Sequence, residues 1–198
     1  MLRFIAIIFL ITFYVGKVFP QSGNAVKVLP EIRLTPTEIE LYKQICEYRV
    51  QKGLPEVKLS KSLCLVARTH AQDQTANFKY GSRCNLHSWS EKGNWLSCCY
   101  TPDPKKAQCM WDKPRELTNY SGNGYEISFY STYRFDSTEA AAKDILDGWK
   151  KSPGHNDMII NKNTWKDVVW KAMGIAVLGD FANVWVGEET DIAGGPEK

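Results

Sequence analysis

The sequence predicts an α+β fold, in which helices come first and an antiparallel pair of strands comes last. A capping box over Thr35–Glu38, with Pro36 at the first helical position, predicts a strong helix start. Residues 168–178 and 182–186 are β-like and flank a short Gly-Asp turn, which predicts a hairpin. Cysteines in a chain that begins like an exported protein predict that disulfides stabilise this fold.

Each remaining element is predicted from local signals. Gly53 ends the first helix, and Ser60 can cap a second one whose apolar residues recur with helical spacing. Residues 125–130 alternate as a short strand does. A second capping box over Asp136–Glu139 predicts a helix that continues to Trp149.

The stretch from Tyr80 to Gly124 shows no lasting period and is rich in Gly, Pro, Asn, Ser, Cys and Trp. A loop this long in a compact domain is usually functional or cross-linked. An even cysteine count in an exported chain predicts three disulfides, whose pairing the sequence leaves open. A zinc site is the rival interpretation, but no Cys-x2-Cys spacing supports it. The six cysteines are Cys46, Cys64, Cys84, Cys98, Cys99 and Cys109.

The first residues have the pattern of a secretory signal peptide: a short positive start followed by an apolar run too short to span a bilayer. Cleavage is expected between Gly16 and Ala25, and a retained N-terminal anchor is the alternative. No later segment is apolar enough to cross a membrane, so we expect a secreted, extracellular or periplasmic protein. The predicted organisation is a signal peptide (1–20), an extended leader (21–34), one domain (35–190) with a Cys/Trp-rich insert (85–123), and a tail (191–198).

Charge and motif content exclude several classes of function. The formal net charge is +3 and falls to about +1 once the signal region is removed, which gives no reason to expect a nucleic-acid partner. Gly122–Gly124 is too short to hold a phosphate, and no serine lies in a Gly-x-Ser-x-Gly elbow. Trp89, Trp95 and Trp111 can line a carbohydrate or lipid surface, although packing over a cystine-rich loop is the commoner role of such residues.

The most informative stretch is residues 148–160, which carries His155 directly after Ser-Pro-Gly. Pro153 is expected to stop the preceding helix, and Gly154 allows a sharp turn. His155 is therefore predicted to project from a rigid corner rather than to lie within a helix. An imidazole held in this way is a ligand, a proton carrier or a buried hydrogen-bonding group.

Three residues at junctions between irregular and regular segments are the candidate site: His87, Glu126 and His155. Two imidazoles can bind a divalent ion, most naturally Zn²⁺, and a carboxylate can complete the shell or act as a base on bound water. The alternatives are a capping or packing role for each histidine and a salt-bridged strand position for Glu126. His70 lies on a helix face beside small apolar residues, which favours packing.

Several segments together resemble the CAP superfamily, the domain of cysteine-rich secretory proteins, antigen 5 and pathogenesis-related 1 proteins, also called the SCP domain. The likeness covers roughly residues 38 to 188 and is greatest to the bacterial-type branch. Its most specific part is Gly148-Trp149 followed by Ser152–Ile159. The other matching segments are Glu47–Arg49, Gly53–Pro55, Leu59–Leu63, Ala67–Asp73, Leu86–Ser88, Gly124–Ser128 and Met173–Val177.

The resemblance implies a three-layer α-β-α sandwich with a central antiparallel sheet. It also places His87, Glu126 and His155 in an open cleft that can hold a divalent metal, with His87 and His155 as its ligands. The chain departs from the family pattern at Ile127, where an Asn is usual, and near Lys151-Ser152, where some members have a second acidic residue.

The leading functional hypothesis is a secreted CAP-domain protein that binds an extracellular lipid, sterol, peptide or protein without catalysing a reaction. A second hypothesis is a metal-dependent hydrolase in which His87 and His155 hold zinc and Glu126 is the base. A third is a structural or interaction module whose working surface is the Cys84–Cys109 insert. None of the three requires a nucleic-acid partner or an integral membrane segment in the mature chain.

Overall fold

The structure is a computed structural model that describes residues 26–101, 103 and 106–197. The predicted signal peptide, residues 1–20, lies outside the described residues. None of the described helices is both long and apolar enough to cross a membrane. The elements are α1 (Pro36–Gln51), α2 (Lys61–Asn77), α3 (Gln108–Trp111), α4 (Lys113–Leu117), β1 (Tyr125–Tyr130), α5 (Thr138–Lys151), α6 (Pro153–Ile159), η2 (Asn163–Trp165), β2 (Ala172–Leu178) and β3 (Phe181–Gly187).

A small antiparallel sheet confirms the predicted α+β class. Its strand order is β1-β3-β2, with Tyr125 opposite Val186 in one pair and Ala172 opposite Gly187 in the other. β2 and β3 form the predicted hairpin. Every residue of β3 is buried because the strand is central and side chains cover both of its faces. β1 is an edge strand.

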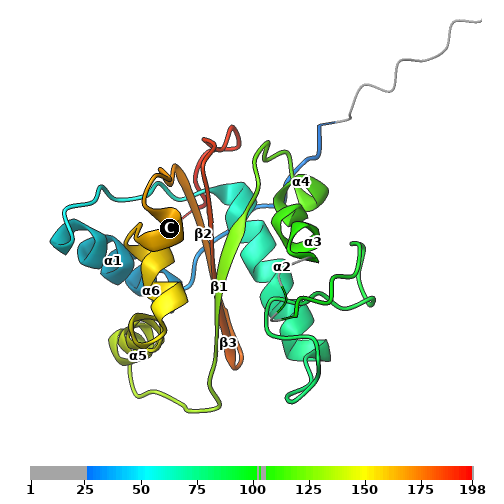
Figure 1. Cartoon of the computed structure of the whole chain (residues 1–198), viewed down its shortest axis with the longest axis horizontal. Helices are drawn as coiled ribbons and strands as arrows, with labels where there is room; N and C mark the ends of the chain where they lie inside the picture. Colours follow the sequence, from blue (N-terminus) through cyan, green and yellow to red (C-terminus); the bar gives the residue numbers. More distant parts are fainter. Residues whose placement is uncertain (1–25, 102, 104–105, 198) are drawn as a thin grey trace, which may run out of the picture.

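Helices lie on both sides of this sheet (Figure 1). α2 packs against β2 and β3, whereas α1 packs against α5 on the other side. The approach of α2 is unusually close at Gly174, where an added Cβ would lie 2.0 Å from the backbone carbonyl carbon of Leu63. Only glycine permits this approach, because any side chain there would push the helix away from the strand.

The cap of α1 is the one that the sequence predicts. Thr35 Oγ1 accepts a hydrogen bond from the backbone N–H of Glu38, and the Glu38 carboxylate accepts one from the N–H of Thr35. Ser60 caps α2 as predicted, accepting from the N–H of Leu63. At α5 the prediction is wrong by one residue: the cap is Ser137 rather than Asp136, because Ser137 is extended and its hydroxyl accepts from the N–H of Ala140.

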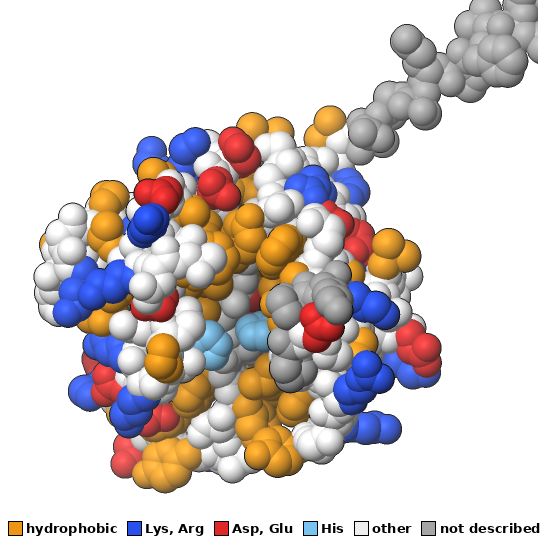
Figure 2. Space-filling model, viewed as in Figure 1, with side chains coloured by type: hydrophobic (Ala, Val, Ile, Leu, Met, Phe, Trp, Pro, Cys, Tyr) orange, Lys and Arg blue, Asp and Glu red, His pale blue; other side chains and the backbone are white. Residues whose placement is uncertain are grey.

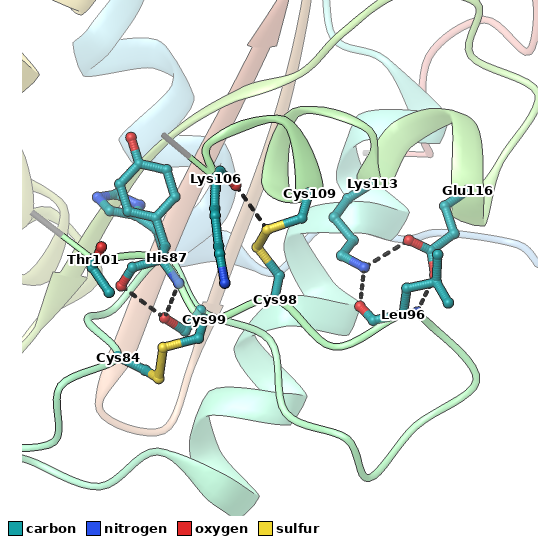
Figure 3. Close-up of a disulfide and its surroundings, with 12 residues drawn as sticks. Cys84, His87, Leu96, Cys98, Cys99, Thr101, Lys106, Cys109, Lys113 and Glu116 are labelled. Atoms are coloured by element: carbon teal, nitrogen blue, oxygen red, sulfur yellow. Dashed lines mark hydrogen bonds and ion pairs between the residues drawn. A yellow bond between two sulfur atoms is a disulfide. The ribbon is translucent and has the colours of Figure 1, made fainter. Parts of the chain in front are cut away.

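The prediction of three disulfides is also wrong, because the described residues, which include all six cysteines, contain two (Figure 3). They join Cys84 to Cys99 and Cys98 to Cys109, so both lie within the irregular segment. Cys46 and Cys64 are buried free thiols. They belong to α1 and α2, which lie on opposite sides of the sheet, and a disulfide requires Cα atoms within about 7 Å.

Residues 80–124 are less irregular than the sequence suggests, because this segment contains the short helices α3 and α4. Besides the disulfides, a buried lysine holds the segment together. Lys113 Nζ donates to the Glu116 carboxylate (2.6 Å) and to the backbone oxygen of Leu96, and it lies 5.2 Å from the ring centre of Trp89. These contacts fasten the Trp89–Leu96 stretch to α4, and Figure 3 shows those of Lys113 with Leu96 and Glu116.

The described parts of the predicted leader and tail contact the domain. Arg33 and Glu197 form an isolated parallel bridge, and their side chains form an ion pair at 3.0 Å. Asp191 accepts hydrogen bonds from the hydroxyls of Ser60 and Ser62 and from the N–H of Ser62. The tail therefore adds a carboxylate to the N-terminal end of α2, where negative charge is favourable.

Candidate functional site

The three predicted site residues come from three parts of the structure that meet at the edge strand. Glu126 is the second residue of β1, His87 lies in the irregular segment after α2, and His155 lies on α6. The prediction that His155 projects from a non-helical corner is wrong. The helix end that the sequence predicts before Pro153 is present, since α5 ends at Lys151 and Ser152 is extended, but Pro153 then begins a new helix, α6. Proline is tolerated in a first turn because the N–H that it lacks would have no intrahelical partner there.

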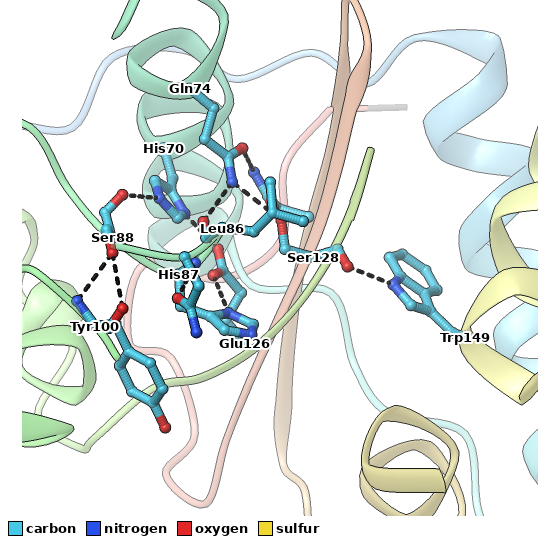
Figure 4. A network of polar contacts seen from close by, with 11 residues as sticks. His70, Gln74, Leu86, His87, Ser88, Tyr100, Glu126, Ser128 and Trp149 are labelled. Carbon is cyan, nitrogen blue, oxygen red and sulfur yellow. Dashed lines mark hydrogen bonds and ion pairs between the residues drawn. The ribbon is translucent and has the colours of Figure 1, made fainter. Parts of the chain in front are cut away.

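Glu126 is the centre of a buried polar network (Figure 4). Its side chain has no exposed area, and each carboxylate oxygen contacts a different histidine. Oε1 lies 2.5 Å from Nδ1 of His70, and Oε2 lies 2.8 Å from Nδ1 of His87. Alternation along β1 explains this position, because Glu126 and Ser128 point towards α2.

The contacts of His70 fix its protonation state. Nε2 lies 3.0 Å from the backbone carbonyl oxygen of Ser88, which can only accept a hydrogen bond. Nδ1 faces the carboxylate of Glu126, which also accepts when ionised. Both ring nitrogens must then donate, so we infer that His70 is an imidazolium forming a buried ion pair with Glu126. Its ring also stacks on Trp89, with centroids 4.4 Å apart and planes 6° from parallel.

The pKa of Glu126 is set by this environment. Burial by itself raises the pKa, but the charge of His70 and hydrogen bonds from His70 and His87 outweigh it and lower the pKa to about 2. The carboxylate is therefore ionised and a weak base. Its contribution to stability is present above about pH 4.3, the usual pKa of an unfolded Glu, and is lost as the pH falls towards 2.

The same carboxylate determines the tautomer of His87. Since Glu126 Oε2 accepts, Nδ1 of His87 carries the proton. In the neutral imidazole, Nε2 is then an unprotonated acceptor, and it has no hydrogen-bond partner among the described residues. His87 is held from its backbone as well, since its N–H donates to Asn85 Oδ1 at 3.0 Å. The ring packs edge-on against Tyr100, 5.3 Å away between centroids.

His155 faces His87, with 6.2 Å between ring centroids. Neither of its ring nitrogens has a hydrogen-bond partner in the part of the chain that the structure describes. Burial lowers the pKa of His155, repulsion from His87 lowers it further, and Glu126 partly offsets both, giving about 4. His155 is therefore neutral at pH 7 and presents one acceptor and one donor nitrogen.

This pKa predicts a pH dependence of stability. An unfolded His takes up its proton near pH 6.5, whereas folded His155 takes it up near pH 4, so the free energy of unfolding falls as the pH drops between these values. We expect His155 to account for a loss of about 2–3 kcal/mol over this window and none above it. Urea unfolding of the wild type and His155→Gln from pH 7.5 to 4 measures the difference. If the free energy of unfolding fell equally steeply with decreasing pH in both proteins, the prediction would be contradicted.

The two facing histidines lie at a hollow in the molecular surface. Figure 2 shows histidine side chains at its base, between the lobe that contains α5 and α6 and the lobe that contains the insert. His70 has no exposed area and does not contribute to that surface. On the α6 side, the Tyr48 hydroxyl donates to Asn156 Oδ1 at 2.9 Å. The hollow thus joins the two sides of the sheet across the edge of β1.

The residues present do not form a complete metal site. No group of three or more His, Cys, Asp or Glu side chains among the described residues is arranged to hold a metal ion. Both oxygens of Glu126 are already occupied by histidine N–H groups, which leaves His87 and His155 as the only donors of the predicted set. Protein zinc sites usually have three or four protein ligands, so this set fits zinc poorly.

His70 is the residue whose role the sequence interpretation underestimated. It does pack against its neighbours, as predicted, but it is also the charged partner of Glu126. A signal was available: His70, Asp73 and Gln74 form a polar stripe, at helical spacing, on a helix whose core-facing residues from Leu63 to Ala67 are apolar. Buried polar side chains at such positions are hydrogen-bonded.

Gln74, another member of that stripe, supports the site through a second set of buried hydrogen bonds between α2 and the sheet. Gln74 Nε2 donates to the hydroxyl of Ser128 at 3.0 Å, that hydroxyl donates to Asn183 Oδ1 at 2.6 Å, and Asn183 Nδ2 donates back to Gln74 Oε1 at 2.7 Å. All three residues are buried. The closed ring fixes β1 and β3 relative to α2, and with them the position of Glu126.

Comparison with known proteins gives information on the fold. No known family model and no curated protein matches the sequence. An outer surface protein from Borrelia burgdorferi is similar in structure, with a TM-score of 0.53 and 17% identity over 82% of this chain and 99% of that one. A cysteine-rich secretory protein from Staphylococcus aureus matches with a TM-score of 0.49 and 17% identity over 77% of this chain. An extracellular protein containing an SCP domain from Bacillus anthracis matches with a TM-score of 0.49 and 14% identity over 80% of this chain.

At these identities the comparisons concern the fold alone, and the Borrelia protein, with a TM-score above 0.5, carries that conclusion. This chain therefore shares a fold with that protein, and membership of the CAP superfamily stays a prediction from the sequence. The chain spans 38% of the staphylococcal protein and 45% of the Bacillus protein, so the activities of those longer proteins are not transferred to it.

Proposed function

We propose that this protein is a secreted, non-enzymatic binding module whose ligand enters the hollow at His87 and His155. The observation that carries the proposal is the pair of facing imidazoles whose outward nitrogens have no partner among the described residues. A buried His70–Glu126 ion pair orients one of them. The proposal includes the three-layer α-β-α sandwich that the family resemblance implies. It also includes export of the protein, which the two disulfides favour because disulfides persist in oxidising compartments.

The protonation states limit the chemistry of the ligand. His87 offers an acceptor nitrogen held in place by Glu126, and His155 is neutral at pH 7. The charge of Glu126 is balanced by His70, so this buried pair adds no net charge to the hollow. The best complement is a neutral group that donates a hydrogen bond, such as a peptide N–H or an alcohol O–H. Peptides, proteins and sterols all contain such groups.

Among the described residues, no serine or cysteine side chain is hydrogen-bonded to the ring of His87, which supports binding rather than turnover. A histidine that donates to a carboxylate and presents its other nitrogen resembles the base of a catalytic triad. The hydroxyls closest in sequence to His87 are engaged elsewhere: Ser88 Oγ donates to the backbone oxygen of Tyr100, and Ser90 Oγ donates to Asp73 Oδ1. Glu126 is fully buried and cannot contact a water molecule in the hollow. Nothing in this geometry favours the metal-dependent hydrolase over a binding module.

Ligand-observed NMR with paired probes tests this proposal. N-acetylglycine amide and cyclohexanol carry a donor, whereas N-acetylsarcosine dimethylamide and methoxycyclohexane do not. We expect the two donor-bearing probes to bind weakly to the wild type and the two methylated probes not to bind. The His87→Ala, His155→Ala double variant should bind neither, while Glu139→Ala, which changes an exposed residue of α5, should behave as the wild type.

Two outcomes would overturn the proposal. One is equal binding of the donor-bearing and methylated probes, which would remove the histidines as acceptors. The other is hydrolysis of peptide or ester substrates, with or without added zinc, that disappears in His87→Ala. That result would establish an enzyme.

A further inference from the structure

A second pocket lies away from the histidines, at the end of the sheet where β1 finishes and β2 turns into β3. Its volume is about 400 Å³, within the range of small-molecule sites. It is formed where the last residues of β1, the β2–β3 turn and the start of α5 come together, and it shares no residue with the His87, Glu126 and His155 site. Phe129 lines it, and the side chain of Phe129 points away from α2 because it alternates with Ser128 along β1.

Four aromatic side chains contribute to the walls of this pocket. Phe129, Phe135, Phe181 and Tyr133 all line it, with Ile145 adding an aliphatic surface. Tyr133 and Phe135 meet edge to face, 4.9 Å apart between centroids, and Tyr133 remains 68% exposed. The ring of Phe129 fits closely against α5, where an added Cβ at Gly148 would lie 2.5 Å from it.

The charges of the lining are not balanced. Three charged residues line the pocket: Arg134, Asp136 and Asp180. Arg134 forms an ion pair with Asp180 at 2.7 Å, and its guanidinium also donates to the backbone oxygen of Thr132. Asp136 has no ion-pair or side-chain hydrogen-bond partner among the described residues. One guanidinium and two carboxylates leave the pocket with a formal charge of −1.

We propose that this pocket binds a small organic cation with an apolar body, an alkyl- or arylammonium compound. Aromatic faces attract ammonium groups, and the attraction increases when the site excludes water. The unpaired carboxylate of Asp136 adds to it, whereas an anion would be repelled and would have to compete with Asp180 for Arg134. The proposal is independent of the ligand of the histidine hollow, because the two sites share no residue.

Calorimetric titration with three probes of matched shape tests the proposal: hexyltrimethylammonium, 1-heptanol and heptanoate. We expect the ammonium compound to bind about tenfold more tightly than the alcohol, and heptanoate to bind least. Asp136→Asn should reduce affinity for the ammonium compound about fivefold and leave the alcohol unaffected. Ser137, the N-cap of α5, is unchanged in this variant, so α5 should still begin at Thr138.

The matched control is Glu139→Gln, which removes the same charge three residues along the chain from a residue that does not line the pocket. It should leave all three affinities unchanged. Equal binding of the ammonium compound and the alcohol would mean an apolar pocket without charge selection. Tightest binding of heptanoate would point to an anionic lipid, and no binding of any probe would mean that the pocket does not admit ligands. Each of these results overturns the proposal, as does an equal effect of Asp136→Asn and Glu139→Gln.

Discussion

Replacing Glu126 with alanine is expected to lower the free energy of unfolding by about 3–5 kcal/mol, because it leaves the imidazolium of His70 buried without a counter-charge. His70 has no exposed side-chain area, so water cannot replace the carboxylate. Two hydrogen bonds are lost together, one from each histidine. Urea unfolding at pH 7 measures the change. A loss below about 0.5 kcal/mol, the size of an ordinary surface substitution, would contradict the assignment of a buried ion pair.

Glu126→Gln separates the charge of this residue from its shape. Gln keeps the volume, and its amide N–H can face Nδ1 of a His70 that has lost a proton. We therefore expect Glu126→Gln to lower the free energy of unfolding at pH 7 by less than Glu126→Ala does. Equal losses for the two variants would mean that the amide does not replace the carboxylate as a partner of His70.

Removing the Cys84–Cys99 disulfide by a double substitution to serine is expected to cost about 3 kcal/mol, the entropy of a closed loop of this length. The loop contains His87, so the effect should reach the histidine hollow. In NMR spectra we expect the ring resonances of His87 to broaden or shift in the double variant. Those of His70 should move less, because His70 lies on α2.

Thiol titration provides the control for the disulfide pattern. Unfolded without a reductant, the wild type should release two reactive thiols, those of Cys46 and Cys64. In the native state both are buried, and burial raises the pKa of each thiol, so they should react slowly. No thiols on unfolding would restore the sequence-based expectation of three disulfides.

Local signals in the sequence were sufficient for most of the fold. The capping box at Thr35, the cap at Ser60, the strand over residues 125–130 and the terminal hairpin are all properties of neighbouring residues, and all are present. The cap of α5 moved by one residue because Asp136 and Ser137 are both good caps, and only the backbone conformation distinguishes them.

Pairing over long distances was less predictable. Cysteine spacing does not reveal which side of a sheet each helix occupies, so Cys46 and Cys64 could not be excluded as partners. His155 was misplaced for a related reason. Pro153 both follows the end of α5 and begins α6, and a sequence signal for a helix end does not show that another helix starts directly after it.

By itself, the sequence determined the class of fold, the position of the elements and the identity of His87, Glu126 and His155 as residues of interest. These depend on local backbone preferences and on residue chemistry, which require no knowledge of contacts. Only the tertiary structure decided how these residues contact one another. It brings His70 from α2 against Glu126, which fixes the charge of one histidine and the tautomer of another, because a buried carboxylate and a carbonyl oxygen can only accept.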